Sequence, residues 1–213
     1  IDAELNQTDS LLRHTEQALE LFPNQAPLWF YNGVGHLLKK QPAKGIKALE
    51  YGRKLATDNP ELLAQFDTQL GDAYHEVKDY AKSDAAYEAA LAFDANNAQA
   101  LNNYSYYLSL RGLQLEKAKE MAGKLVKQFP DNDTYLDTYA WVLYKLKDYA
   151  GARQYLEKAL RSTSDATVIE HYGDVLYQLG EKDQALTQWQ RAQKRGGASP
   201  LIDRKIKDKK LYE

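Results

Sequence analysis

The chain has 213 residues, a formal net charge of −2 and no cysteine. Because the two signs of charge nearly cancel, no global field attracts nucleic acid or an anionic membrane. The lack of cysteine excludes disulfides, thiolate nucleophiles and cysteine-ligated zinc. The apolar share of 44% is ordinary for a globular chain, and runs of Val and Thr are nearly absent, so the composition favours helices over strands.

Residues 1–22 are predicted to form one helix that ends at Pro23, matching the second helix of a pair whose first helix is missing. No apolar run of membrane-spanning length and no signal peptide is present, and Ile1 is not a natural start, so we expect a fragment or a processed form. Five helix pairs follow, over residues 28–40 with 43–56, 62–77 with 80–93, 98–110 with 115–129, the two halves of 135–160, and 167–179 with 182–194. Residues 200–212 are expected to form a short, strongly basic helix or tail.

The fourth pair shows the pattern most clearly. Its first half places apolar side chains at i, i+3, i+4 and i+7, which is one face of a helix, and its second half does the same; the residues are Leu136, Tyr139, Ala140 and Leu143, then Ala152, Leu156, Ala159 and Leu160. Lys147 and Asp148 between them allow only a tight turn, so the two helices must be antiparallel. One such pair cannot bury its apolar face alone, which predicts a solenoid of stacked pairs.

Small residues recur in the first helix of each pair at Gly35, Gly71, Ser105, Ala140 and Gly173, spaced by 36, 34, 35 and 33 positions. A small residue also recurs in the second helices, at Ala48, Ser83, Ala118, Ala152 and Ala185. A bulky residue follows it at Tyr87, Leu156 and Trp189, whereas Gly52 and Ala122 depart from this slot. With Pro60 and Pro130 as terminators, this pattern resembles the tetratricopeptide repeat family over nearly the whole chain.

This resemblance implies an all-α fold, a right-handed α-α superhelix of antiparallel helix pairs. The expected organisation is a second helix of a truncated preceding repeat at 1–27, repeats at 28–60, 61–97, 98–132, 133–165 and 166–197, and a basic capping helix or tail at 198–213. Phrases such as LNNYSYYLSLRG and EHYGDVLYQLG look like repeat proteins common in bacteria, often of the Bacteroidetes type. That likeness implies a bacterial scaffold and favours the cell-envelope or periplasmic side over the cytoplasm.

In this family the first helices line a concave groove, which implies the site. The groove residues expected to meet a partner are Asp72, His75, Asn102, Tyr106, Asp137, Trp141, Tyr144, Glu170, Asp174 and Tyr177. Aromatic rings beside carboxylates suit a protein or peptide segment that carries apolar and basic side chains. The alternative is that these rings only pack between adjacent repeats.

Other chemistry has little support in the sequence. Where a carboxylate clamp would need lysines, the chain has Asn102 and Asp137. The four histidines have no metal spacing, and an acid/base role for Glu170, His171 and Asp174 is disfavoured against a polar helix face in a groove. We therefore expect no enzyme activity, no cofactor, no metal, no nucleic-acid binding and no direct membrane insertion.

Two functional hypotheses remain open. The first is a noncatalytic scaffold that binds a partner in the groove. The second is a structural or assembly role, in which the chain self-associates or stacks on upstream repeats through the N-terminal half-repeat, whose Leu11, Leu12, Ala18 and Leu19 would leave one face uncovered. The basic tail is interpreted as a cap whose apolar face seals Trp189, with phosphate or an acidic partner as the alternative; that face is Leu201, Ile202, Ile206 and Leu211.

Overall fold

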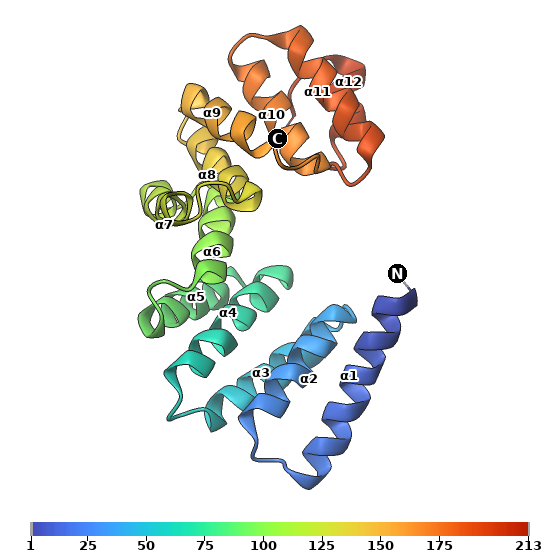
Figure 1. Ribbon diagram of the computed structural model, residues 1–213, viewed down its shortest axis with the longest axis vertical. Coiled ribbons are helices and arrows are strands. Elements are labelled where there is room, and N and C mark those ends of the chain that lie inside the picture. Colours follow the sequence, from blue (N-terminus) through green and yellow to red (C-terminus); the bar gives the residue numbers. More distant parts are fainter. Residues whose placement is uncertain (1, 213) are drawn as a thin grey trace. The chain divides into compact units, whose positions relative to one another are not determined.

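The computed structural model describes residues 2–212, with side chains from residue 6 onward, and this range contains twelve α-helices and no strand (Figure 1). The helices are α1 (Asp2–Leu21), α2 (Ala26–Leu38), α3 (Pro42–Leu55), α4 (Pro60–Glu76), α5 (Tyr80–Phe93), α6 (Ala98–Arg111), α7 (Leu115–Gln128), α8 (Asp133–Lys145), α9 (Tyr149–Ala159), α10 (Ala166–Gln178), α11 (Lys182–Arg195) and α12 (Ile202–Asp208). The predicted all-α fold class is confirmed.

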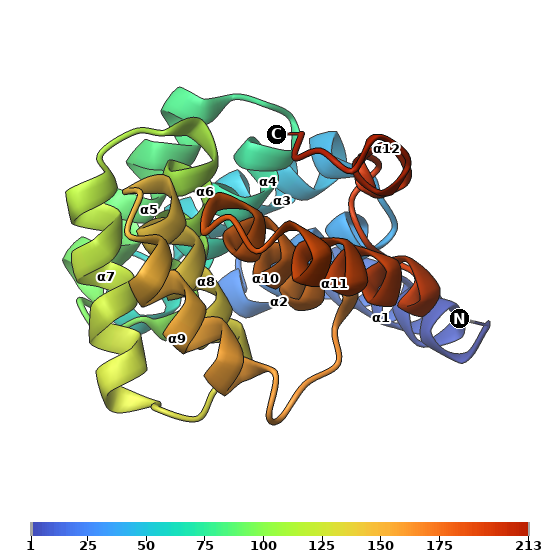
Figure 2. The same ribbon diagram turned by 90° about the horizontal axis from the view of Figure 1, so that it is seen from above.

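The chain divides into two compact units, residues 1–104 (unit 1) and 105–213 (unit 2), with the boundary inside α6. In unit 1, α2 pairs with α3 and α4 pairs with α5, while α1 packs on α2 and α3 packs on α4. In unit 2, α8 pairs with α9 and α10 pairs with α11, while α7 packs on α8, α9 on α10 and α12 on α11. The α10–α11 pair runs side by side in both Figure 1 and Figure 2. Each unit is thus a stack of helix pairs.

The turn between the two helices of a pair has the same backbone feature in every pair. Each turn has a residue in the left-handed conformation, at Lys40 (φ 58°), Lys78 (64°), Gly112 (64°), Lys147 (64°) and Gly180 (86°), and the turn after α6 has a second one at Gln114 (45°). Such a residue ends a helix by turning the chain away from its axis. Two of these turns continue with an aspartate that caps the next helix, because Asp79 and Asp148 accept hydrogen bonds from the backbone N–H groups of Lys82 and Gly151.

Within a pair, the helices approach so closely that a glycine faces a large side chain. A Cβ atom at Gly71 would lie 2.7 Å from Tyr87 Cζ, and one at Gly173 would lie 2.6 Å from Trp189 Cδ1. Tyr87 and Trp189 each come sixteen positions after the glycine, and both are fully buried. These contacts pin the register of one helix against the other.

The first pair follows the same rule with a different glycine from the one expected. A Cβ atom at Gly33 would lie 2.6 Å from Leu49 Cγ, again sixteen positions later, and the turn residue Lys40 follows Gly33 by seven positions, as Lys78 follows Gly71. Gly35 instead faces Leu12 of α1. The assignment of the small slot to Gly35 is therefore wrong, and Leu49 fills the bulky slot that had been assigned to Gly52.

The length of α4 explains this error. Its 17 residues exceed the 13 residues of α2, α8 and α10 by about one helical turn, which lengthens the spacing between the first two repeats. A period near 34 therefore selects Gly35, which lies two positions after Gly33, the glycine that makes the contact.

Apolar cores fill the space between the helices of each unit. In unit 1, Leu49, Phe66 and Leu70 form one cluster, and a bidentate hydrogen-bonded ion pair between Arg53 of α3 and buried Asp67 of α4 lies in the same unit. In unit 2, one cluster contains Leu136, Ala140, Leu143, Ala152, Leu156 and Ala159 of the apolar face expected for the fourth pair, and the partly buried Tyr139 and Leu160 pack against it. A second cluster joins Ile169, Trp189 and Ile202, with Ile206 and Leu211 packed against it.

The close approach at Gly173 predicts a stability effect. We expect Gly173→Ala to lower the free energy of unfolding by about 1–3 kcal/mol, because the added methyl group must displace the Trp189 indole. Gly123→Ala is the matched control, since its Cβ atom would meet Tyr139 at an ordinary 3.5 Å, and it should be neutral or stabilising by up to about 1 kcal/mol. Chemical denaturation measures both values, and equal stability of the two variants would contradict the register described above.

Candidate functional site

A cavity of about 510 Å³ opens among the helices of unit 2. Residues from α6, α8, α10 and α12 line it, together with the segments just before and just after α12. The lining residues are Tyr106, Leu110, Trp141, Lys145, Thr167, Glu170, His171, Asp174, Gly197, Ala198, Ser199, Pro200, Leu201, Lys205 and Tyr212. The C-terminal segment is therefore part of this cavity.

A column of stacked rings forms the wall of the cavity on α8 and α10. The Trp141 indole stacks on the Tyr144 ring with centroids 4.7 Å apart, and on the His171 imidazole at 4.0 Å. Lys145 places its ammonium group 5.0 Å from the Trp141 centroid, within the range of a cation–π interaction. Stacking buries the rings, since Trp141 is only 7% exposed and Tyr144 only 3%.

His171 is held by a carboxylate from the neighbouring repeat. Its Nδ1 atom lies 2.9 Å from Asp137 Oδ1. Burial of the imidazole works to lower its pKa, but the Asp137 carboxylate opposes this, aided by Asp174 and Glu170, so the pKa of His171 is raised above its ordinary value. The protonated ring is thus favoured, and it links α8 to α10.

The acidic pair on α10 faces a lysine of the same chain. Lys205 of α12 is 3% exposed, and its ammonium group donates to Glu170 Oε1 at 2.8 Å and to Asp174 Oδ2 at 2.7 Å. Ser199 also donates to Glu170, from its backbone N–H at 2.7 Å and its hydroxyl at 2.6 Å. The two carboxylates are therefore already occupied, and a basic side chain of a partner would reach them only by displacing Lys205.

The two carboxyl groups respond differently to this environment. Burial raises the pKa of Asp174 to about 6, although Lys205 and the Trp189 indole N–H both favour its charged form. Burial also opposes ionisation of Glu170, but the hydrogen bonds from Lys205 and Ser199 outweigh it, so the pKa of Glu170 is lowered. Tyr106, across the cavity, has its pKa raised to about 12 by burial and by the carboxylates of Asp137 and Glu170.

One polar atom of the ring column has no partner. The indole Nε1 of Trp141 is buried and has no hydrogen-bond acceptor among the residues that the structure describes. Leaving a buried donor unsatisfied costs about 1–3 kcal/mol, so an acceptor supplied from outside the chain would be favoured here. No group of three or more His, Asp or Glu side chains within residues 6–212 is placed to hold a metal ion.

Four residues named from the sequence line the cavity directly: Tyr106, Trp141, Glu170 and Asp174. Asp137 and Tyr144 do not line it, but each contacts a residue that does: Asp137 contacts His171, and Tyr144 stacks on Trp141. Tyr177 instead stacks on Trp189 with centroids 5.6 Å apart, in the packing between α10 and α11.

The remaining three belong to unit 1 and make separate contacts. Asp72 accepts hydrogen bonds from Tyr87, Gln99 and Asn103, and burial raises its pKa. His75 lies 5.3 Å from the Tyr80 ring, and Asn102 donates to Asn103. None of these three residues lines the unit 2 cavity.

Sequence reasoning missed Lys205 and Ser199 as cavity residues. A signal existed, because Glu170 and Asp174 stand four positions apart on one helix face and need a cation when buried, and the only strongly basic stretch nearby follows α11. Which of its lysines turns inward depends on the packing of α12 and could not be predicted.

The His171–Asp137 pair predicts a pH dependence of stability. Because the folded pKa of His171 lies above its ordinary value of 6.5, the pair stabilises the protein fully below pH 6.5, and this contribution is lost as the pH rises through the folded pKa. We expect Asp137→Asn to lower the melting temperature by roughly 2–4 °C more in mildly acidic than in alkaline buffer, which corresponds to about 1 kcal/mol. Asp131→Asn is the control, since Asp131 forms only an exposed ion pair with Lys158, and equal losses for Asp137→Asn at both pH values would contradict the assignment.

Comparison with known proteins reveals several similarities. A family model described as "Tetratricopeptide repeat" matches residues 68–97, and one described as "Anaphase-promoting complex, cyclosome, subunit 3" matches residues 111–192. The chain is 27% identical to the "TPR repeat-containing protein PA4667" of Pseudomonas aeruginosa, over 82% of this chain and 30% of that protein. It is 27% identical to the "Type IV pilus assembly protein PilF" of the same species, over 70% of this chain and 58% of that one. The chain thus spans less than two thirds of either relative.

Among solved structures, the APC/C hetero-tetramer Cut9-Hcn1 is similar with a TM-score of 0.82 and 14% identity, covering 97% of this chain and 40% of that one. At that identity the likeness concerns the fold alone. None of the described helices combines the length and the hydrophobicity needed to cross a membrane. The repeat pattern, the matching family models and the stacked helix pairs together show that the chain belongs to the tetratricopeptide repeat family.

Proposed function

We propose that unit 2 binds a segment of a partner protein in its cavity, with the Trp141 indole as the anchor. Members of this repeat family act as scaffolds for protein–protein interaction, which supports the general role. The observation that carries the specific proposal is the buried Nε1 of Trp141, which lacks an acceptor beside a cavity of about 510 Å³. A backbone carbonyl of an entering segment would satisfy this donor.

The chemistry of the cavity defines the segment. Tyr106, Trp141 and Leu201 offer apolar surface for one or two aliphatic or aromatic side chains. The carboxylates of Glu170 and Asp174 suit a lysine or arginine of the partner, which would take the place that Lys205 now fills. The partner is thus a segment with apolar and basic side chains, and binding of its basic group competes with α12.

A conservative substitution tests the anchor. We expect Trp141→Phe to weaken a peptide selected on the wild-type protein by about five- to tenfold, because an aromatic ring is kept while the N–H donor and the five-membered part of the indole are lost. The probe is a displayed library of random peptides, and the affinities of selected peptides are measured by titration calorimetry. Tyr172→Phe is the control, since it removes a hydroxyl that bonds to Glu157 elsewhere in unit 2, and it should leave the affinity unchanged. Unchanged affinity for Trp141→Phe would refute the anchor.

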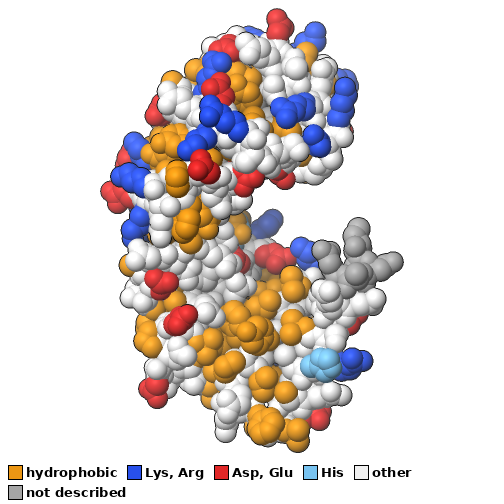
Figure 3. Space-filling view, in the orientation of Figure 1, with side chains coloured by type: hydrophobic (Ala, Val, Ile, Leu, Met, Phe, Trp, Pro, Cys, Tyr) orange, Lys and Arg blue, Asp and Glu red, His pale blue; other side chains and the backbone are white. Residues whose placement is uncertain are grey.

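A second candidate function is self-association at the end of α1. Leu21 is 74% exposed and the adjacent Phe22 is 58% exposed, which is unusual for large apolar side chains. On the face drawn in Figure 3, hydrophobic side chains gather over unit 1. Contact with a second copy of the chain, or with preceding repeats, would remove such side chains from water.

Sedimentation velocity tests this second candidate. If α1 mediates self-association, the sedimentation coefficient should rise with protein concentration, and the double change Leu21→Asp, Phe22→Asp should abolish the rise because it places charge in the contact. Exposed Leu113 lies in unit 2, so Leu113→Asp is the matched control and should leave the rise intact. A coefficient that is independent of concentration for the wild type would remove this candidate.

A further inference from the structure

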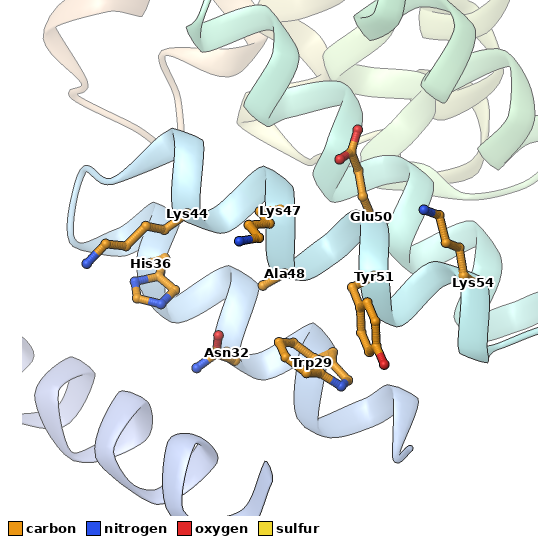
Figure 4. Close-up of a pocket in the computed structure, with 9 residues that line it drawn as sticks. All are labelled: Trp29, Asn32, His36, Lys44, Lys47, Ala48, Glu50, Tyr51 and Lys54. Atoms are coloured by element: carbon orange, nitrogen blue, oxygen red, sulfur yellow. The ribbon is translucent and has the colours of Figure 1, made fainter. Parts of the chain in front are cut away.

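Unit 1 contains a second concave feature, a groove of about 590 Å³ between α2 and α3 (Figure 4). Trp29, Asn32 and His36 contribute to it from α2, and α3 contributes Lys44, Lys47, Ala48, Glu50, Tyr51 and Lys54. The unit 2 cavity shares none of these residues. This groove is therefore separate from the binding function proposed above.

The apolar part of the groove is held in one arrangement. The Trp29 and Tyr51 rings lie against each other with centroids 4.7 Å apart and planes tilted by 57°. Trp29 Nε1 donates to the Pro23 carbonyl at 2.8 Å, and Asn32 donates to Thr15 of α1 at 3.1 Å. Ala48 lies between the lysines of α3, where a small side chain leaves room. A partner side chain would meet a preformed aromatic surface, so little conformational entropy would be lost on binding.

The charged part of the groove carries three lysines and one glutamate, so its net charge is positive. Lys44, Lys47 and Lys54 fall on one side of α3, at spacings that follow the helical repeat, and all three are exposed. None of them forms an ion pair with a carboxylate in the part of the chain that the structure describes. Glu50 is the acidic residue of the groove, and it is engaged by the Tyr74 hydroxyl of α4. The stripe therefore keeps a net positive charge, which Glu50 offsets only in part.

From this arrangement we infer that the groove between α2 and α3 binds an acidic amphipathic helix of a partner protein. The stretch from Lys44 to Lys54 rises about 15 Å along the axis, or roughly three turns, which matches a helix lying along it. Carboxylates on one face of that helix pair with the three lysines. One large apolar side chain of the helix packs on Trp29 and Tyr51, as an anchor does in helix-in-groove recognition.

A nucleic acid fits the same groove less well. Bases stack on exposed ring faces, whereas Trp29 and Tyr51 cover one another at a steep tilt, and the Trp29 edge is fixed to Pro23. The groove has no arginine, and Glu50 stands among its lysines. The formal charge of the chain, −2, also supplies no long-range attraction for a polyanion.

Counter-selection makes the test specific for this groove. The probe is a displayed library of random peptides roughly 15 residues long, enough for about four helical turns. Peptides are selected on the wild-type protein and then depleted on the charge-reversal variant Lys44→Glu, Lys47→Glu, Lys54→Glu. A control variant, Lys127→Glu, Lys194→Glu, Lys207→Glu, carries the same change in formal charge at three exposed lysines outside the groove. Circular dichroism and thermal melts verify that each variant folds, and a glutamine triple variant at positions 44, 47 and 54 replaces the reversal if that one is unfolded.

The inference expects surviving peptides that carry an excess of Asp and Glu around one large apolar residue. Their affinity should fall by at least about tenfold for the groove variant and by less than about twofold for the control variant, and it should weaken as salt is added. Survival of no peptide, or of peptides without acidic excess, would overturn it. A labelled single-stranded oligothymidine is titrated in parallel, and its binding to the wild type but not to the groove variant would overturn the acidic helix in favour of nucleic acid.

Discussion

The close contact between the two helices of a pair is the constraint on which the rest of this structure depends. At Gly33, Gly71 and Gly173 the backbone of the first helix lies against Leu49, Tyr87 and Trp189 of the second, with no room for a Cβ atom. A glycine seven positions before the turn residue and a bulky residue sixteen positions after the glycine fix how far the second helix slides along the first. This register decides which side chains of a pair face the next pair and which lie at a cavity.

The register decides which aromatic side chains pack inside a helix pair and which lie beside the cavity. Trp141 follows Ala140, which takes the small position in the fourth pair, and its ring turns away from that contact towards α10, where it stacks on His171. Asp137 lies one helical turn earlier on α8 and reaches the same imidazole. The ring column is therefore packed between α8 and α10, and it keeps an indole N–H buried beside a cavity without an acceptor among the described residues. Such a group is tolerated because the surrounding contacts hold it in place.

The carboxylates at the unit 2 cavity are buried, whereas the lysines and the glutamate at the unit 1 groove are exposed. In unit 2, Glu170 and Asp174 are buried and are answered by Lys205 and Ser199 of the same chain, so α12 both covers the last pair and supplies the cation that the pair requires. In unit 1, buried Asp67 is likewise paired with Arg53. The three groove lysines of α3 are instead exposed and form no ion pair with the described residues, and the aromatic pair beside them is preformed. A buried charge must be compensated within the fold, whereas an exposed charge is solvated by water and needs no partner in the same chain. One protein could thus hold an internally satisfied pocket and an open groove with different preferences.

The sequence by itself determined the helices, their pairing, the turns at Lys78 and Lys147 and the family. These depend on local periodicity, on capping and on side-chain size, all of which can be read within one repeat. Only the tertiary structure decided that Gly33, rather than Gly35, makes the contact in the first pair, because the extra turn of α4 lies outside the repeat pattern. It also decided that Lys205 is the lysine that enters the acidic pocket, and that Trp29 of α2 and Tyr51 of α3 line one groove. These features depend on contacts between residues that are distant in the chain or on different faces of neighbouring helices, and no spacing rule within a single helix predicts them.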